Sequence, residues 1–244
     1  MSGAPVDPRL SVVMPVFNEE HTVLGSLARV LEQSFVRDVV IVNDASTDGT
    51  AAQLAAIDDA RVTVLVHPVN QGKGAAIRTG IPLTLGPYVA IQDADLEYDP
   101  ADLERLLGPL DAGHADVVYG SRFLSGDARR VLYFWHSVGN RLLTLVSNMV
   151  SNVNLTDMET CYKVFRKPYI DAITIEENRF GFEPEITVKM ARMGARMYEV
   201  GISYAGRGYD EGKKIGWKDG VSALRCIIWY GLRVRRSRAP RPVD

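Results

Sequence analysis

Short apolar, β-branched runs alternate with segments of helical length through the first half of the chain. The runs, which we expect to form strands, are residues 10–16, 39–42, 62–66, 88–91 and 117–119. The segments between them, which have helical length and apolar spacing, are residues 20–31, 50–57, 74–83 and 101–110. A chain that repeats strand and helix in this way builds a parallel sheet covered by helices. The pattern therefore predicts an α/β fold with a doubly wound, mostly parallel sheet and helices on both faces.

The second half of the chain is less regular but carries the same kinds of element. We expect helices at residues 131–150, 183–193 and 218–233, and strands at residues 162–166 and 197–200. No internal repeat, low-complexity tract or linker separates the two halves. With 244 residues, 46% of them hydrophobic, the chain is long enough to bury a full core. We expect a single domain over residues 1–244, with its halves at 1–125 and 126–233 and a basic tail at 234–244.

Charge and cysteine content exclude several classes of protein. Lys and Arg number 28 against 30 Asp and Glu, so the formal charge of −2 gives no support for nucleic-acid binding. Cys161 and Cys226 lack the spacing of a disulfide framework or a zinc site. The first residues lack the pattern of a signal peptide, and no apolar run reaches roughly 18 residues. We therefore expect a cytoplasmic protein without a membrane span.

Polar residues follow four of the expected strands. Ligands of open α/β sheets bind at the carboxyl ends of the strands, so these residues are the candidates for a site. They are Pro15, Asn18 and Glu19 at the first strand, Asn43 and Asp44 at the second, Asn70, Gln71, Gly72 and Lys73 after the third, and residues 92–97 after the fourth. The four groups belong at one edge of the sheet.

Three common ligand motifs are absent from these positions. No G-x-G-x-x-G follows the first strand, which excludes the dinucleotide fingerprint. The P-loop fails because Gly74 stands where a Ser or Thr holds magnesium. An EF-hand beginning at Asp44 fails because Ala55 occupies the position of the bidentate Glu.

The densest acidic signal is Asp93, Asp95 and Glu97. In an extended chain these alternate side chains face one point, where carboxylate oxygens suit Mg²⁺ or Mn²⁺. An ordinary solvated turn before a helix cap at Asp99 is the other explanation. Lys73 lies near the same edge and would balance a diphosphate, although an exposed lysine at a helix start explains it equally well.

These strings, in this order and spacing, resemble glycosyltransferase family 2, the inverting nucleotide-sugar transferases of the GT-A fold. The matching strings are residues 12–20 (VVMPVFNEE), 40–50 (VIVNDASTDGT), 70–74 (NQGKG), 92–97 (QDADLE) and 120–122 (GSR). They cover about the first 125 residues. Within the family they look most like the polyprenyl-phosphate sugar transferases, such as dolichol-phosphate mannose synthase. The resemblance implies a GT-A-type, Rossmann-like sheet with a nucleotide-sugar-binding first half and an acceptor-binding second half.

The resemblance also assigns roles to residues of the first half. It implies that Pro15, Asn18 and Glu19 line the nucleotide pocket and that Asp44 contacts the base. Lys73 and Asp93 would bind the nucleotide sugar. Asp93, Asp95 and Glu97 would hold the metal, with Asp95 also catalytic; Glu97 stands where relatives often have Gln. Arg122 would face a phosphate.

The second half matches the family less continuously. Residues 157–163 (DMETCYK) resemble a family loop, and Arg207 with Lys213 resembles a phosphate-binding segment. Arg122, Arg207 and Lys213 would hold the acceptor phosphate, with Arg122 and Arg207 catalytic.

A phosphate acceptor needs no general base, because its second pKa of about 6 leaves it anionic at neutral pH. An alcohol acceptor needs one, and the candidates are Asp157, Glu159, Glu183 and Glu185.

The expected function is transfer of a hexose from a nucleoside-diphosphate sugar, of the GDP-mannose or UDP-glucose type, to a polyprenyl or dolichyl phosphate. A metal-dependent transferase acting on a soluble sugar or glycan is the alternative, and a nucleotide-sugar-binding protein without turnover is a third hypothesis.

Two segments are candidates for peripheral contact with the cytoplasmic face of a membrane: residues 131–135, and residues 226–230 with the arginine tail behind them. A homo-oligomer that buries Trp135 or Trp229 would give the same pattern.

Overall fold

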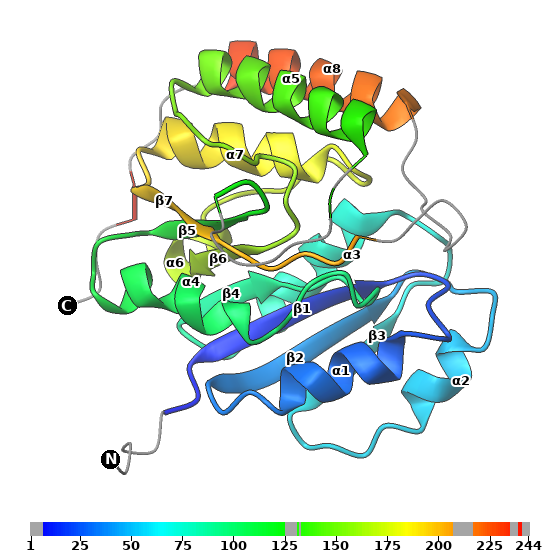
Figure 1. Cartoon of the computed structure of the whole chain (residues 1–244). Coiled ribbons are helices and arrows are strands. Elements are labelled where there is room, and N and C mark those ends of the chain that lie inside the picture. Colours follow the sequence, from blue (N-terminus) through cyan, green and yellow to red (C-terminus); the bar gives the residue numbers. More distant parts are fainter. Residues whose placement is uncertain (1–6, 125–130, 132, 207–216, 235–238, 241–244) are drawn as a thin grey trace.

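A seven-stranded sheet forms the centre of the molecule in the computed structural model (Figure 1). The structure describes residues 7–124, 131, 133–206, 217–234 and 239–240, without the side chains of residues 217–219. The strands are β1 Leu10–Val16, β2 Val36–Asn43, β3 Val62–Val66, β4 Tyr88–Ile91, β5 Val117–Ser121, β6 Lys163–Arg166 and β7 Met197–Gly201. Their order across the sheet is β3-β2-β1-β4-β6-β5-β7.

The expected alternation of strand and helix is confirmed in the first half. The helices are α1 Val23–Leu31, α2 Thr50–Ala55, α3 Lys73–Gly80, α4 Asp102–Asp111, α5 Phe134–Ser151, α6 Lys167–Asp171, α7 Phe182–Met193 and α8 Trp217–Arg233, with a 3-10 turn at Ile81–Leu83. Each expected strand and each expected helix is present, with ends displaced by up to three residues. The short helix α6 was not predicted.

Strand β6 is the exception to the parallel arrangement. It lies between β4 and β5 and runs antiparallel to both, with Ala90 opposite Val164 and Tyr119 opposite Lys163. The other neighbouring pairs are parallel. The sheet is therefore mostly parallel, as predicted, and the beginning of β6 lies at the edge where β4 and β5 end.

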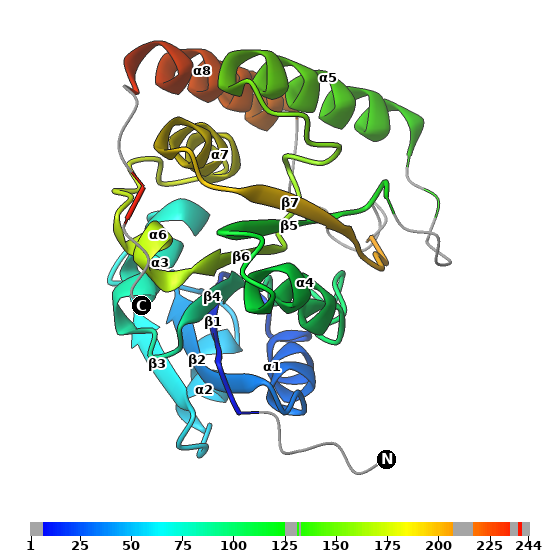
Figure 2. The same cartoon turned by 90° about the vertical axis from the view of Figure 1, so that its left-hand side faces the viewer.

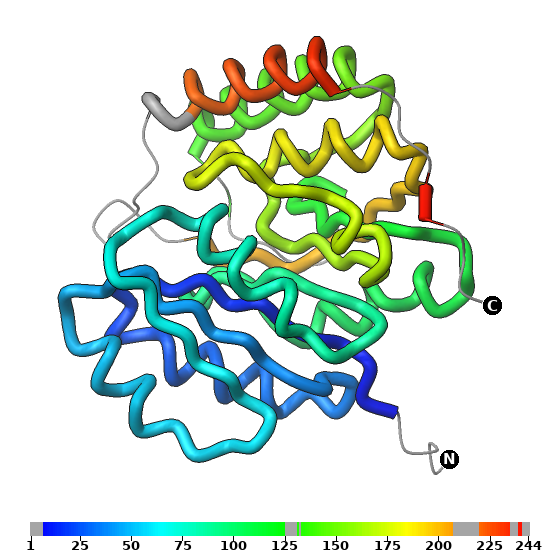
Figure 3. The backbone as a smooth tube through the Cα atoms, turned by 180° about the vertical axis from the view of Figure 1, so that it is seen from behind, coloured from blue at the N-terminus to red at the C-terminus, as the bar shows by residue number. Residues whose placement is uncertain are grey.

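Helices cover both faces of the sheet. In Figure 2, α1 and α4 lie on one face and α3 and α6 on the other. Above the β5–β7 end, α7 forms a layer next to the sheet, and α5 and α8 lie side by side beyond it; the view from behind gives the same order (Figure 3). The central strands β1, β2, β4, β5 and β6 are buried between these layers, and most of their apolar residues form one core. A two-sided cover explains why the strands are continuously apolar rather than alternating.

The loop before α3 packs against the segment that precedes α7. The amide of Ala75 donates to the carbonyl oxygen of Asn178 at 3.1 Å. A Cβ atom on Gly74 would lie 2.1 Å from the carbonyl oxygen of Glu177. Only glycine permits this approach of two backbones, and the approach fixes the start of α3, where Lys73 lies.

Gly74→Ala should therefore destabilise the protein by about 2 kcal/mol, as overpacking of a fixed backbone does. The matched control is Gly139→Ala, in the middle of α5, where an added Cβ meets nothing within 4 Å. Alanine favours the helix there, so this variant should gain roughly 0.5–1 kcal/mol. Urea unfolding of both variants measures the difference. Equal effects of the two substitutions would contradict the packing argument.

Candidate functional site

The carboxyl ends of β1, β2, β4 and β5 bring the predicted residues to one edge of the sheet. Parallel pairing aligns Val16 with Asn43 and Val13 with Ile91, so the turns that follow these strands are neighbours. β5 ends beside the beginning of β6. The parallel direction of these four strands is sufficient for this, because residues that follow parallel strands lie at the same edge of a sheet.

Asp44 is buried at the end of β2 and organises the loop before α3. Its carboxylate accepts hydrogen bonds from the amides of Gln71 and Gly72 at 2.9 and 2.6 Å. His67 Nδ1 lies 2.7 Å from Asp44 Oδ1. The carbonyl oxygen of Asp44 accepts a further bond from Asn70 at 3.1 Å. Both carboxylate oxygens of Asp44 thus hold the protein's own loop in place.

The turn after β1 is tied to the turn after β2. Asn18 has a left-handed backbone with φ of 53°, and its side-chain oxygen accepts from the amide of Thr47 at 2.8 Å. Glu19 accepts from the hydroxyl of Thr22 at 2.8 Å, and its amide donates to Thr50. Pro15 lies half-buried within β1. These contacts place Pro15, Asn18, Glu19 and Asp44 around the same pair of strand ends.

Lys73, at the start of α3, lies between the carboxylates of Asp93 and Glu183. Its Nζ is 3.0 Å from both carboxylate oxygens of Asp93 and 3.1 Å from Oε1 of Glu183. Burial opposes the charge of Lys73, but Asp93 and Glu183 hold the pKa of Lys73 well above its ordinary value. Lys73 is therefore a permanent cation here, not an exposed lysine at a helix start.

The acidic run after β4 does not stay extended. Leu96 has a left-handed backbone with φ of 63°, so the chain turns between Asp95 and Glu97. The amide of Glu97 donates to Asp95 Oδ1 at 3.2 Å, and the carboxylate of Glu97 accepts from the hydroxyl of Tyr204 at 2.6 Å. The expectation that alternation makes Asp93, Asp95 and Glu97 face one point is wrong. Among the described residues, no three acidic, His or Cys side chains gather into a metal-binding group.

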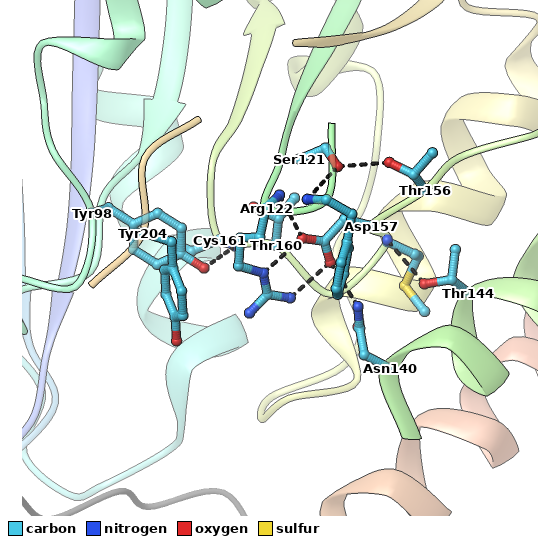
Figure 4. A network of polar contacts seen from close by, with 12 residues as sticks. Tyr98, Ser121, Arg122, Asn140, Thr144, Thr156, Asp157, Thr160, Cys161 and Tyr204 are labelled. Carbon is cyan, nitrogen blue, oxygen red and sulfur yellow. Dashed lines mark hydrogen bonds and ion pairs between the residues drawn. The ribbon is translucent and has the colours of Figure 1, made fainter. Parts of the chain in front are cut away.

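Arg122, at the end of β5, forms a bidentate ion pair with Asp157 (Figure 4). Nε and Nη2 of Arg122 donate to the carboxylate at 2.6 and 2.7 Å, and the Arg122 amide adds a bond of 3.1 Å. Burial opposes the charge of Arg122, but Asp157 raises the pKa of Arg122 well above its ordinary value. Two parallel charge-assisted bonds fix the direction of the guanidinium group as well as its charge.

Tyr204 joins the arginine to the acidic turn. Its ring centroid lies 5.2 Å from Cζ of Arg122, a cation–π distance, and its hydroxyl is bonded to Glu97. The ring of Tyr98 lies 5.2 Å from that of Tyr204. The two sides of the site, the acidic turn and the arginine, are thereby held at a fixed separation.

A second buried lysine lies behind the arginine. Lys163, at the beginning of β6, donates to the carbonyl oxygens of Met158 and Thr160 and lies 4.8 Å from the ring of Tyr119. Burial lowers the pKa of Lys163. Burial, reinforced by Glu183, raises the pKa of Glu159 to about 8. Within the described part of the chain, Oε1 of Glu159 and Oε2 of Glu183 are buried without a hydrogen-bond partner.

The four candidate bases differ in what already binds them. Both oxygens of Asp157 are taken by Arg122 and Asn140, and both oxygens of Glu185 accept amides from residues 176 and 177. Glu159 and Glu183 are the two that keep an unbonded oxygen among the described residues.

Two predicted phosphate ligands, Arg207 and Lys213, lie outside the described residues, as do Arg235, Arg236, Arg238 and Arg241 of the tail. Sequence reasoning missed Tyr204, Lys163 and Asn140. Lys163 falls within the string at 157–163, which was a signal for it, whereas no motif or pattern marks Tyr204 or Asn140.

The outer sides of α5 and α8 are apolar and exposed. On α5, Trp135 is 76% exposed and Leu142 58%, and on α8 Trp229 is 42% exposed. The other exposed apolar residues of the two helices are Phe134, Val138, Leu145, Met149, Val221, Leu224, Ile228 and Leu232. The guanidinium carbon of Arg233 lies 3.4 Å from the ring centroid of Trp229. No helix in the described part of the chain is both long and apolar enough to span a bilayer.

The chain is similar in sequence to known proteins over most of its length. The model of glycosyl transferase family 2 matches residues 11–174. An undecaprenyl-phosphate mannosyltransferase of Micrococcus luteus is 31% identical, over 93% of this chain and 98% of its own length. A polyprenol monophosphomannose synthase of Mycolicibacterium smegmatis is 28% identical, over 97% of this chain and 95% of its own length.

The fold has solved counterparts as well. A glucosyl-3-phosphoglycerate synthase of Mycobacterium tuberculosis, solved with Mn²⁺, uridine diphosphate and glucosyl-3-phosphoglycerate, has a TM-score of 0.69 at 19% identity. The match covers 91% of this chain and 79% of that one. At this identity the likeness shows the fold alone, and it confirms the predicted GT-A-type α/β architecture.

The raised pKa of Glu159 predicts a pH-dependent stability. In the unfolded chain the group has its ordinary pKa of 4.5, whereas in the fold the pKa is about 8. Between these values the folded state keeps a proton that the unfolded state has lost, so this group makes stability fall as pH rises from about 4.5 to 8. Glu159→Gln removes this pH dependence. The difference in Tm between Glu159→Gln and wild type should therefore increase from about pH 4.5 to 8 and stay constant above pH 8.

Thermal unfolding of both proteins at pH 5, 7 and 9 measures the trend. Glu32→Gln, at an exposed carboxyl, controls for the loss of one charge. A difference between Glu159→Gln and wild type that stays constant with pH would show that Glu159 ionises normally in the fold.

Proposed function

We propose that this chain, which belongs to glycosyl transferase family 2, moves a hexose from a nucleoside-diphosphate sugar to a polyprenyl phosphate. The observation that carries the proposal is Arg122, a bidentately held cation at the same sheet edge as the acidic turn, whose side chain is only 14% exposed. The relatives that match nearly the whole chain bear the names of transferases for polyprenyl phosphates.

The donor belongs at the ends of β1, β2 and β4. Pro15, Asn18, Glu19 and Asp44 surround the strand ends where the nucleotide would lie, and a GDP-mannose or UDP-glucose type of donor is proposed. Asp44 would act on the base through the loop that it holds rather than with an unbonded carboxylate. Lys73 lies where a diphosphate would follow.

The acidic turn suits a divalent cation with phosphate ligands. Asp93 and Asp95 both lie in the turn that follows β4. Mg²⁺ is usually held by one or two carboxylates together with substrate phosphates. We propose Asp93 and Asp95 as ligands, with the carboxylate of Asp93 shared between the cation and Lys73. Glu97 is bound to Tyr204 and would contribute only if that bond opened. When bound, Mg²⁺ or Mn²⁺ would neutralise charge on the leaving diphosphate.

The acceptor phosphate belongs beside Arg122, with Arg207 and Lys213 as further proposed ligands. A phosphomonoester is anionic at neutral pH, so it attacks the anomeric carbon without a general base. Arg122 would orient it for a direct displacement. A single displacement inverts the anomeric centre, and an α-linked donor would give a β-linked lipid phosphate sugar.

Transfer to a sugar or glycan hydroxyl is the second candidate. It needs a carboxylate that can accept a proton, and Glu159 and Glu183 keep an unbonded oxygen. Glu183 already pairs with Lys73 through its other oxygen. The phosphate acceptor is favoured because the relatives that match nearly the whole chain bear the names of polyprenyl-phosphate and polyprenol-monophosphate sugar transferases.

We also propose that the exposed apolar faces of α5 and α8 rest on a membrane, on its cytoplasmic side. Aromatic and aliphatic residues beside arginines are typical of interfacial helices, and a polyprenyl phosphate has to be reached at a bilayer surface. A second copy of the chain, packed on the same faces, is the alternative.

Transfer can be measured by mass spectrometry with a panel of GDP- and UDP-sugars, Mg²⁺ or Mn²⁺, and a polyprenyl phosphate in detergent. We expect a lipid product that disappears with chelator and falls at least about a hundredfold in Asp95→Ala, because a ligand for developing charge is lost. Asp58→Ala, at an exposed acidic residue, should keep full activity. Donor consumed only in the presence of a soluble sugar would sink the lipid acceptor.

Membrane contact can be measured by sedimentation with anionic vesicles. Leu142→Ser and Leu145→Ser each remove an exposed leucine worth roughly 1.5 kcal/mol when buried in lipid, so each should weaken binding about tenfold. Leu85→Ser changes a leucine that is 67% exposed outside these helices and should bind like wild type. If vesicle binding is unchanged and the variants instead alter the molecular mass in solution, the surface is a subunit interface.

A further inference from the structure

Helix α5 has a polar inner side opposite its exposed apolar side. Asn140, Thr144 and Asn148 are spaced by four residues and therefore lie on one face. All three bond to the same segment, residues 155–158, which leads toward β6. The helix thus holds this segment over more than two turns.

The contacts are specific to each position. Asn140 Nδ2 donates to Asp157 Oδ1 at 3.0 Å, and the Met158 amide donates to Thr144 Oγ1 at 3.2 Å. Asn148 Oδ1 accepts a hydrogen bond from the amide of Leu155 at 3.0 Å, and Asn148 Nδ2 donates to the carbonyl oxygen of Leu155 at 2.7 Å. Figure 4 shows Asn140 reaching Asp157 from α5 on the side away from Arg122.

Asp157 is held from a third direction through its backbone. The amides of Thr156 and Asp157 donate to the carboxylate of Glu199, on β7, at 2.8 and 3.1 Å. The side chain of Asp157 is fully buried. Its Oδ1 accepts from both Arg122 Nη2 and Asn140, so the orientation of the guanidinium group depends on a carboxylate that α5 helps to fix.

Asn140 and Asn148 differ in how completely they are bonded. Asn148 uses both ends of its amide, whereas Oδ1 of Asn140 is buried without a hydrogen-bond partner in the described part of the chain. A buried polar atom without a partner reduces stability. The one side-chain hydrogen bond that Asn140 makes in the described part of the chain goes to the carboxylate that binds Arg122, and this contact points to a role in the site.

We propose that Asn140 and Asp157 are positioning residues that fix Arg122 for the acceptor phosphate. The inference rests on the proposed function of Arg122. It makes α5 a supporting part of the reaction centre, because the orientation of a phosphate-binding guanidinium is as important as its charge.

Two variants of the same residue type on one helix test the proposal. Asn140→Ala should lower kcat/KM for the polyprenyl phosphate about tenfold and leave KM for the donor within about twofold. Asn148→Ala removes two hydrogen bonds to the same segment, and it should lower Tm at least as much while kcat/KM stays within about twofold of wild type. Loss of activity that follows Tm in both variants, or equal loss toward donor and acceptor, would overturn the proposal.

A second readout does not need the reaction. The ¹⁵N–¹H signal of Arg122 Nε can be assigned by its absence in Arg122→Lys. Its proton should exchange slowly with water in wild type and in Asn148→Ala, and faster in Asn140→Ala. If wild type transfers no sugar to the lipid, the proposed function fails while this signal still decides whether Asn140 immobilises Arg122. Identical exchange in all three proteins would refute the positioning role.

Discussion

The antiparallel direction of β6 is the constraint on which the second side of the site depends. Because β6 begins where β4 and β5 end, the segment that precedes it arrives at the carboxyl edge of the sheet. That segment carries Asp157, Glu159 and Lys163. A parallel strand in the same place would have delivered them to the opposite edge, away from Asp93 and Arg122. One reversed strand thus adds a second wall to the sheet edge at which we propose that the nucleotide binds.

Buried charges at this edge are compensated in separate groups. Lys73 is neutralised by Asp93 and Glu183, and Arg122 by Asp157. Removing one member of such a group leaves an unpaired buried charge, which costs several kcal/mol. The arrangement also keeps each cation protonated and fixed before any phosphate arrives. In the proposed reaction the site would therefore present fixed charges to a phosphate instead of forming them on binding, which is the property that electrostatic catalysis requires.

The sequence predicted the sheet well because its signals are local. Apolar runs mark the strands, and polar residues after β1, β2 and β4 fall at the predicted edge whatever the details of packing. The geometry of the acidic turn was not predictable, since alternation assumes an extended chain and Leu96 adopts a left-handed conformation. The partner of Arg122 was hidden as well, because it lies 35 residues along the chain and depends on the direction of β6. Tyr204 contacts both Arg122 and Glu97 only after β7 has joined β5.

The two sides of α5 bear on how an enzyme of this kind could reach an acceptor that lies in a bilayer. A lipid phosphate lies at the membrane surface, so the cation that receives it has to be held at a set height above that surface. In this structure the helix with the exposed apolar side also bonds, through Asn140, to the carboxylate that orients Arg122. If α5 rests on a membrane as proposed, the width of the helix would set that height. The proposed membrane surface and the side chain that supports the proposed phosphate site therefore lie on one helix, so the position of that helix affects both.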